Sequence, residues 1–329
     1  MNLMPTYKNI LSAAQQIASH AIYTPILESF QLNEILGCRL LIKAECLQLT
    51  GAFKFRGAFN RISRLTKQEL KSGVVAFSSG NHAQGVALAS KIMNTPAVIL
   101  MPKDAPKLKI ENTQAYGAEV VLYDRITENR EKIGQKLAVE RNATLVPSYD
   151  DPYIIAGQGT VGLEIVNQVD NLKASLDAVI APCGGGGLIS GVALALSQDF
   201  PNVDIFAAEP EGFDDTIRSL VANKRLSIDK KQHTICDALM LPTPGQITFS
   251  INKKLLKGGF AIKDIDTSYA MEVAFRYFKI VLEPGGAIAL AAVLSRAFEC
   301  RDKTVCVICS GGNVDYQTFE KSIRKTKKS

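Results

Sequence analysis

The sequence lacks the features of an exported or membrane protein. Its first residues, Met1 to Lys8, contain neither an apolar signal core nor a cleavage site, so we expect no export. Nowhere do about 18 apolar residues follow one another, which is the length a membrane-spanning helix needs. Seven cysteines, an odd number scattered along the chain, indicate reduced thiols. We therefore predict a cytoplasmic protein with no membrane partner.

Signs of nucleic-acid or zinc binding are also lacking. The formal charge of +6 is mild, and the only marked basic cluster is the tail at 321–328, which is typical of a solvated helix end. Aromatic residues do not alternate with basic ones as single-strand binding requires, so we expect no nucleic-acid partner. Cys306 and Cys309 have CxxC spacing without a second pair, and we interpret them as buried strand residues.

Apolar strand-like runs and helix-like segments alternate along the 329 residues. Strands are expected at 74–77, 97–101, 119–123, 144–146, 176–181, 203–208 and 304–309, and helices at 81–91, 106–116, 127–141 and after Gly187. Continuous apolar strands that end at Gly or Pro and alternate with helices are typical of parallel sheets covered on both faces. The sequence therefore predicts an α/β protein of two lobes.

Ligands of such sheets bind where strands end and helices begin, and one of these loops is rich in glycine. Gly184 to Gly187 follow an apolar strand and open a helix, so backbone amides and the helix dipole favour a phosphate. The lysine of a P-loop is missing. A dinucleotide site remains an alternative, because Glu209 follows the next strand, although the third fingerprint position holds Ile189 or Ser190. A tight structural turn is the other alternative.

Two further loops carry reactive or polar groups. Lys54 lies between two phenylalanines after a glycine turn, and desolvation there would lower the amine pKa and make it a nucleophile or base; a surface lysine is the alternative. Residues 78–82, Ser-Ser-Gly-Asn-His, follow a strand and offer a seat for a carboxylate. His82 is either a catalytic base or a polar helix cap, and a serine-hydrolase elbow is missing.

A fourth loop, Ser310 to Asn313, exposes a hydroxyl and an amide at the end of the last strand. An amine, a phosphate cradle, a carboxylate seat and a hydroxyl together suit pyridoxal 5'-phosphate. This cofactor needs an amine for covalent attachment, amides for its phosphate and a partner for its pyridine nitrogen.

The motifs also resemble a known family. The segments are 52–58 (AFKFRGA), 78–84 (SSGNHAQ), 155–160 (IAGQGT), 184–187 (GGGG), 209–210 (EP), 282–287 (LEPGGA) and 310–313 (SGGN). In this order they resemble the fold-type II (tryptophan synthase β-like) pyridoxal-phosphate enzymes of the threonine/serine dehydratase and serine racemase group. The resemblance implies two lobes, each with a parallel-rich sheet flanked by helices. It also implies a large cofactor-binding domain at 1–72 plus 150–329, a small mobile domain at 73–149, no C-terminal regulatory domain, and a homodimer.

The resemblance implies a role for each matching residue. Lys54 would carry the cofactor and later move the Cα proton, and Phe53 would pack against the pyridine ring. The other cofactor contacts would be Asn81 at the 3-hydroxyl, Gly184, Gly185, Gly186 and Gly187 at the phosphate, Ser310 at the pyridine nitrogen, and Glu283 near the ring. The substrate carboxylate would lie beside Ser78, Ser79, Asn81 and His82.

A divalent-cation site is implied as well. Glu209, the carbonyl of Phe213 and Asp215 resemble the cation ligands of the racemase-like members, and hard oxygen ligands suit Mg²⁺ or Ca²⁺. The alternative is an acidic helix start, where Asp214 and Asp215 favour the dipole.

The function that the resemblance implies is that of an L-threonine/L-serine dehydratase, an ammonia-lyase of amino-acid metabolism. β-Elimination of the substrate hydroxyl would give 2-oxobutyrate or pyruvate plus ammonia. Ser79 keeps a serine or aspartate racemase open, because that position is often alanine in pure dehydratases, and a 3-hydroxyaspartate dehydratase is a further alternative. Ala52 departs from the serine common in the family. A β-replacing synthase fits the lysine motif less well, and a non-catalytic phosphate- or nucleotide-binding protein is the alternative from another class.

Overall fold

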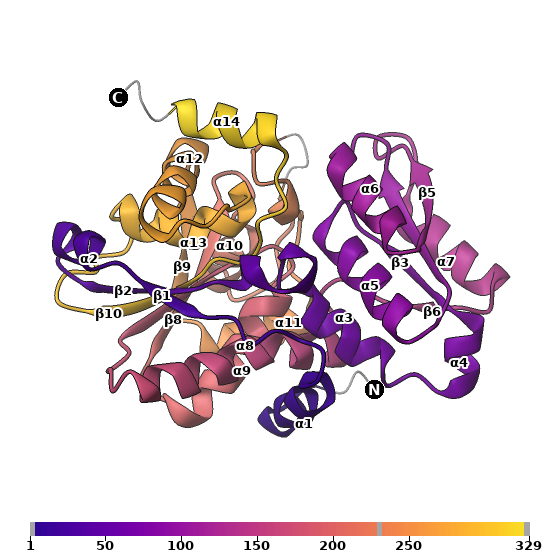
Figure 1. The fold of residues 1–329 in the computed structure, drawn as a ribbon, viewed down its shortest axis with the longest axis horizontal. Coiled ribbons are helices and arrows are strands. Elements are labelled where there is room, and N and C mark those ends of the chain that lie inside the picture. The colour runs from indigo at the N-terminus through magenta and orange to yellow at the C-terminus, as the bar shows by residue number, and fades with distance from the viewer. Residues whose placement is uncertain (1–3, 229–231, 326–329) are drawn as a thin grey trace.

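The computed structural model describes residues 4–228 and 232–325, and it contains two sheets (Figure 1). The larger sheet has the order β1 (Ile26–Glu28), β2 (Arg39–Lys43), β10 (Thr304–Ile308), β7 (Ala178–Pro182), β8 (Asp204–Pro210) and β9 (Gly258–Ile262). Only β1 pairs antiparallel. The smaller sheet, β5 (Glu119–Tyr123), β4 (Ala97–Pro102), β3 (Val74–Phe77) and β6 (Thr144–Leu145), is parallel throughout. The predicted α/β architecture with two parallel-rich sheets is confirmed.

Both faces of the larger sheet are buried. On β7, Val179 packs beneath α8 (Pro152–Asn171) and α9 (Gly187–Asp199), whereas Ile180 packs on the face covered by α12 (Asp264–Val273) and α13 (Pro284–Leu294). Because neighbouring side chains of a strand point to opposite faces, a continuous apolar run supplies both cores. Cys306 lies in β10 and Cys309 directly after it, both as buried free thiols.

The remaining elements complete the two lobes. The larger lobe also contains α1 (Tyr7–Ile17), α2 (Phe30–Leu36), η1 (Glu45–Leu47), η2 (Leu49–Gly51), α3 (Lys54–Ile62), α10 (Asp215–Val221), η3 (Asp237–Leu239), α11 (Gln246–Leu255), η4 (Ala274–Phe278) and α14 (Tyr316–Lys325). The smaller sheet is accompanied by α4 (Lys67–Ser72), α5 (Asn81–Ile92), α6 (Lys107–Ala115) and α7 (Arg130–Glu140). The basic tail at 321–328 lies outside the described residues from 326 onward.

One predicted helix starts in the wrong place. The helix expected from residue 127 begins at Arg130, because the Asn129 side chain accepts a hydrogen bond from the Lys132 amide at 2.9 Å and caps the helix there. The amide of Thr127 is bound instead by the Asp124 carboxylate, at 3.1 Å, in a turn. Local side-chain capping therefore overrides the helical pattern of the preceding residues.

Helix α3 lies between the two sheets (Figure 1). Its Phe55 and Phe59 join the apolar core that Val86 of α5 and the strands of the smaller sheet also form. On its other side α3 meets α8 with backbones in contact, because a Cβ on Gly157 would lie 2.6 Å from the Cα of Gly57. This packing fixes the position of Lys54, the first residue of α3. The domain boundary near residue 72 stays a prediction.

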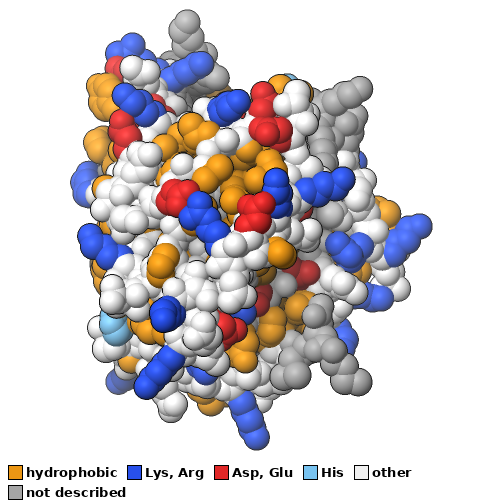
Figure 2. Space-filling model, turned by 90° about the vertical axis from the view of Figure 1, so that its right-hand side faces the viewer, with side chains coloured by type: hydrophobic (Ala, Val, Ile, Leu, Met, Phe, Trp, Pro, Cys, Tyr) orange, Lys and Arg blue, Asp and Glu red, His pale blue; other side chains and the backbone are white. Residues whose placement is uncertain are grey.

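The outer side of the smaller lobe carries charges of both signs. Figure 2 shows basic and acidic side chains mixed across this side, and exposed ion pairs such as Arg141–Glu119, at 2.6 Å, belong to this lobe. No helix in the described part of the chain has the length and apolar character needed to cross a membrane.

Candidate active site

The loops singled out in the sequence meet around Lys54. The Lys54 ammonium donates a hydrogen bond to the carbonyl of Ser148 at 2.7 Å and lies 5.1 Å from the centroid of the Phe53 ring. Burial lowers the pKa of this amine to about 8. An appreciable fraction is therefore neutral near physiological pH, as a nucleophile or a proton acceptor requires. Lys54 is half-buried, and the Ser148 carbonyl binds its amine, unlike that of a free surface lysine.

The glycine loop, residues 184–187, presents backbone groups rather than side chains at the start of α9. Gly186 precedes α9 in the left-handed region, with φ 88°, and the first N–H groups of this helix have no partners within it. Thr248 of α11 donates its hydroxyl to the carbonyl of Gly185 at 2.7 Å, which holds that peptide in place. A Cβ on Gly185 would lie 2.3 Å from the Tyr149 ring, so this position must be glycine. The free amides suit an anion such as a phosphate.

Asn81, Glu283 and the loop that begins at Ser310 lie close together. The Ser310 carbonyl accepts a hydrogen bond from the amide of Phe53 at 3.1 Å, which fixes the end of β10 beside the lysine. The side-chain amide of Asn81, at the start of α5, donates to one carboxylate oxygen of Glu283, at the start of α13. A Cβ on Gly311 would strike both of these side chains. The predicted cofactor contacts are therefore neighbours in space.

Ser78, Ser79 and His82 differ in their surroundings. The two serines are partly exposed, and the Ser78 hydroxyl accepts a hydrogen bond from the Gly80 amide at 3.1 Å. His82 is buried and its Nε2 contacts the Val146 carbonyl at 3.0 Å. Burial, together with the nearby Lys54 charge, lowers the pKa of His82 to about 3, so the ring is neutral. The His82 ring contacts the carbonyl of Val146, and Gly80 rather than His82 is the cap residue of α5.

The predicted cation ligands surround the start of α10. Glu209 and Asp215 are fully buried, and the Glu209 carboxylate accepts hydrogen bonds from the amides of Thr216 and Ile217 at 3.0 and 2.8 Å. Neither carboxylate oxygen of Asp215 has a hydrogen-bond partner among the residues that the structure describes. Burial raises the pKa of Asp215 to about 7, and burial together with the Asp215 charge raises that of Glu209. Phe213, the third predicted ligand, is also buried and lies between them in the chain.

Several site residues were not singled out in the sequence. Ser148 and Tyr149 follow β6. Like the other site loops, they therefore lie beyond the carboxyl end of a strand, where ligands of parallel sheets bind. Thr248 and Lys109 lie inside helices, where a single polar residue gives no signal of its own. Lys109 binds Glu283 at 2.9 Å.

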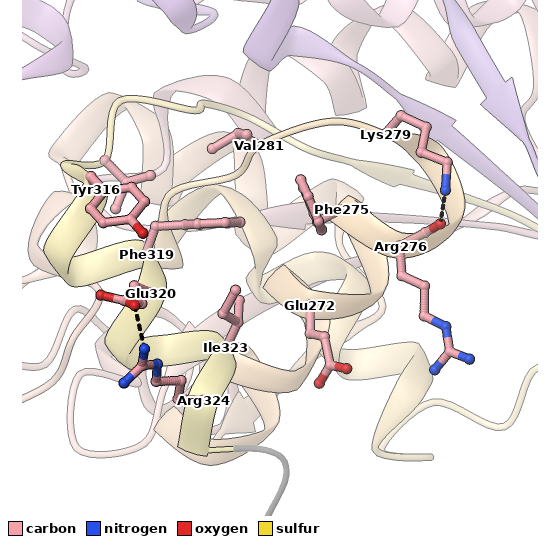
Figure 3. A pocket seen from close by; sticks show the side chains of 11 residues that line it. Glu272, Phe275, Arg276, Lys279, Val281, Tyr316, Phe319, Glu320, Ile323 and Arg324 are labelled. Carbon is pink, nitrogen blue, oxygen red and sulfur yellow. Dashed lines mark hydrogen bonds and ion pairs between the residues drawn. The ribbon is translucent and has the colours of Figure 1, made fainter.

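A cavity of about 1050 Å³ lies elsewhere, between η4 and α14 (Figure 3). Phe275, Val281 and Phe319 give it an apolar lining, and the ion pair of Glu320 with Arg324, at 2.6 Å, lies at its edge. None of the predicted site residues lines this cavity. It is therefore separate from the site around Lys54.

An amine of lowered pKa, next to a helix terminus that suits an anion, meets the main demands of pyridoxal phosphate. The fold and this arrangement place the molecule among the enzymes that use that cofactor.

Comparison with known proteins identifies the family. Residues 17–311 match the family described as "Pyridoxal-phosphate dependent enzyme", and the chain belongs to it. It is 41% identical over 317 residues to L-threo-3-hydroxyaspartate ammonia-lyase of Saccharomyces cerevisiae, covering 96% of each chain. It is 40% identical to serine racemase of Arabidopsis thaliana, covering 97% of this chain and 96% of the relative. The solved structure of maize serine racemase superposes with a TM-score of 0.91 at 38% identity, covering 98% of each chain. A crystal structure of a threonine deaminase superposes with a TM-score of 0.90 at 39% identity, covering 95% of this chain and 99% of that one.

These relatives divide between ammonia-lyases and racemases at nearly equal identity. The chain is therefore a pyridoxal-phosphate enzyme of the β-elimination and racemase family that acts in amino-acid metabolism.

Proposed function

We propose that this enzyme is an L-threonine/L-serine ammonia-lyase that releases 2-oxobutyrate or pyruvate plus ammonia. The observation that supports this most is the Lys54 amine, of pKa about 8, which donates to the Ser148 carbonyl. The next residue, Tyr149, packs against the glycine loop. Such an amine can take the Cα proton of a substrate seated by its carboxylate, which is the first chemical demand of β-elimination.

The cofactor, when bound, supplies an electron sink for the pair released from Cα. The protein contributes position and proton transfer. Ser78, Ser79 and the first amides of α5 would bind the substrate carboxylate, because hydroxyls and free amides at a helix start favour an anion. The glycine loop would hold the cofactor phosphate, and Phe53 would pack against its ring. Lys54 would then hold the proton taken from Cα at its Nζ.

A substrate panel tests the proposal. Purified holoenzyme is incubated with L-threonine, L-serine, D-serine and L-threo-3-hydroxyaspartate, and 2-oxo acid and chiral composition are measured together. Oxo acid from L-threonine or L-serine without D-enantiomer supports the dehydratase. A colourless protein that borohydride does not change would contradict any cofactor-based function and favour a binding protein.

The racemase alternative depends on Ser79, whose hydroxyl has no role in holding the loop within the described structure, unlike that of Ser78. If it returns a proton to Cα, Ser79→Ala should lower racemisation by about 10² to 10⁴-fold, the usual contribution of a positioned proton donor, and spare elimination. Chiral chromatography and an oxo-acid assay on the same samples measure both rates. Equal loss of the two activities would show that Ser79 is not a face-specific acid.

One cation near residues 78–82, the expected carboxylate seat, supports the 3-hydroxyaspartate alternative. The Arg130 guanidinium lies 5.4 Å from the centroid of the Phe77 ring, directly before Ser78, is partly exposed, and pairs with Glu131 at 2.9 Å. A cation there suits a second substrate carboxylate. A strong preference for L-threo-3-hydroxyaspartate over L-threonine in the panel would move the assignment to this substrate.

We also propose a divalent cation, Mg²⁺ or Ca²⁺, at Glu209, the Phe213 carbonyl and Asp215. The two Asp215 oxygens that lack partners in the described structure support it, since a buried carboxylate is normally paired or bound to a metal. In protein stripped with EDTA, saturating Mg²⁺ or Ca²⁺ should raise the melting temperature by about 5 °C. Asp215→Asn should abolish this shift.

Asp214→Asn is the control, because one Asp214 carboxylate oxygen pairs with Arg218 at 2.9 Å, whereas its other oxygen, like both oxygens of Asp215, has no partner in the described structure. It should keep the cation response. Equal responses of the two variants would contradict the assignment of a cation site to Asp215.

The homodimer implied by the resemblance stays a prediction, which sedimentation equilibrium tests.

A further inference from the structure

Lys109 is unusual among the lysines because it is a cation enclosed between the two lobes. It belongs to α6 beside the smaller sheet, yet only 2% of it is exposed. Its ammonium lies 2.9 Å from a carboxylate oxygen of Glu283 and 3.3 Å from one of Asp237, which belong to the large lobe. The side chain therefore forms an ionic contact between the lobes.

The same Glu283 carboxylate is held by a second group from the smaller lobe. Its other oxygen accepts a hydrogen bond from the Asn81 amide. The side-chain oxygen of Asn81, Oδ1, in turn accepts a hydrogen bond from the side-chain amide of Asn313 at 2.9 Å. The same Asn313 amide donates to the backbone carbonyl of Thr50 at 2.7 Å. A continuous network thus joins Lys109 to the loops before α3 and after β10, which carry Lys54 and Ser310.

Gly80 makes room for this lysine. A Cβ at Gly80 would lie 2.3 Å from the Cδ of Lys109 and 3.1 Å from its Nζ. The glycine between Ser79 and Asn81 therefore lets the Lys109 side chain pass directly beneath the substrate loop.

The charges of this network depend on Lys109. Burial and the nearby Asp237 raise the pKa of Glu283, whereas the Lys109 ammonium lowers it. Glu283 and Asp237 in turn raise the pKa of Lys109 despite its burial. Asp237 remains partly exposed, at 34% of its side chain, so water shares in its solvation. Without Lys109, the side-chain donor left to the buried Glu283 carboxylate in the described structure would be the neutral amide of Asn81.

We propose that Lys109 is a positioning residue that fastens the smaller lobe to the large lobe and holds the Glu283 carboxylate by an ion pair, so that Asn81 stays oriented at the cofactor site. This inference rests on the proposed cofactor-dependent function for its catalytic consequence. Its structural consequence, the contact between the lobes, can be measured in the protein without cofactor. A failure of this inference can therefore be told apart from a failure of the proposed function.

The test compares Lys109→Met with Lys107→Met, an exposed position one half-turn earlier on α6. In the cofactor-free protein, Lys109→Met should lower the melting temperature by about 5–10 °C, the usual effect of leaving a buried charge unpaired. It should also speed hydrogen exchange in α6. Lys107→Met should match the wild type, and Lys109→Arg should restore most of the loss.

Glu283→Gln distinguishes an ionic role from simple packing. In the Lys109→Met background it removes the unpaired charge, so the double variant should be more stable than Lys109→Met alone. In the wild-type background the same change leaves Lys109 less well paired and should destabilise. If Glu283→Gln has the same effect in both backgrounds, the pair is not coupled and the inference is wrong.

A pH profile tests the link to the cofactor. In loaded Lys109→Met, burial without the neighbouring ammonium should raise the pKa of Glu283 further, and the cofactor absorbance should change as this carboxyl titrates. The wild type and the double variant should show no such change. A flat profile in Lys109→Met overturns the electrostatic role, and wild-type protein that takes up no cofactor would refute the proposed function while leaving the stability coupling measurable.

Discussion

Replacing Lys54 with alanine is expected to abolish turnover, by about 10⁴-fold or more, because the residue is both the attachment point of the cofactor and the base at Cα. The variant should also lose the absorbance of the lysine-bound cofactor. The fold should persist, since the Lys54 ammonium donates to the Ser148 carbonyl and forms no ion pair with another described residue. Absorbance spectra, an oxo-acid assay and a melting curve on the same preparation give the three readouts.

Lys54→Arg is the matched control for charge. It keeps the cation but cannot deprotonate, so it should be as inactive as the alanine variant. In the wild type, covalent uptake of pyridoxal phosphate, trapped with borohydride, should speed up as pH rises through about 8, because the neutral amine is the nucleophile. An unchanged spectrum in Lys54→Ala, or activity in Lys54→Arg, would overturn the assignment.

The strands and the ligand-facing loops could be predicted because their signals are local. Strand β3 at 74–77 and strand β5 at 119–123 have the bounds expected from the sequence, since apolar runs enclosed by Gly or polar residues leave little choice. The glycine loop follows from the position of strand ends in parallel sheets, and Lys54 from its place between two phenylalanines after a glycine turn. Helix α7 was misplaced at its start because its cap, Asn129, is one side chain among several polar ones.

Long-range ionic contacts could not be predicted from the sequence. Lys109 and Arg56 look like ordinary charged residues on helices, whose charges are usually solvated. Their partners, Glu283 and Glu164, follow 174 and 108 residues later. Only the folded chain shows that both cations are buried. Sequence motifs therefore indicate the residues around Lys54. The buried ion pairs that support them, those of Lys109 and Arg56, become visible only in the folded structure.

Arg56 illustrates how that supporting part positions the reactive lysine. It lies two residues after Lys54 on α3, 1% exposed, and its guanidinium binds two glutamates. It contacts both oxygens of Glu45 at 2.8 Å, and both oxygens of Glu164 at 2.6 and 2.9 Å. Lys43 completes the cluster by binding Glu164 at 2.6 Å. Two cations thus face two anions in a region that is largely shielded from solvent.

Arg56→Met should therefore destabilise the protein by about 3–5 kcal/mol. It leaves the buried Glu45 carboxylate without its ion-pair partner, and the largely buried Glu164 with Lys43 alone. We expect a melting temperature about 10 °C lower. Arg56→Lys should recover only part of this, since an ammonium cannot make the paired contacts of the guanidinium fork. Differential scanning calorimetry measures both.

Arg39→Met is the matched control, because Arg39 pairs with Glu28 at 3.0 Å but is 35% exposed. An exposed pair of this kind contributes about 0.2–1 kcal/mol, so the melting temperature should fall by no more than about 3 °C. Similar losses in Arg39→Met and Arg56→Met would contradict the argument from burial. Because Arg56 ties α3 to η1 and α8, its loss should also lower turnover in the folded fraction, whereas Arg39→Met should leave turnover unchanged. A folded Arg56→Met enzyme with wild-type turnover would show that the cluster stabilises the large lobe without positioning Lys54.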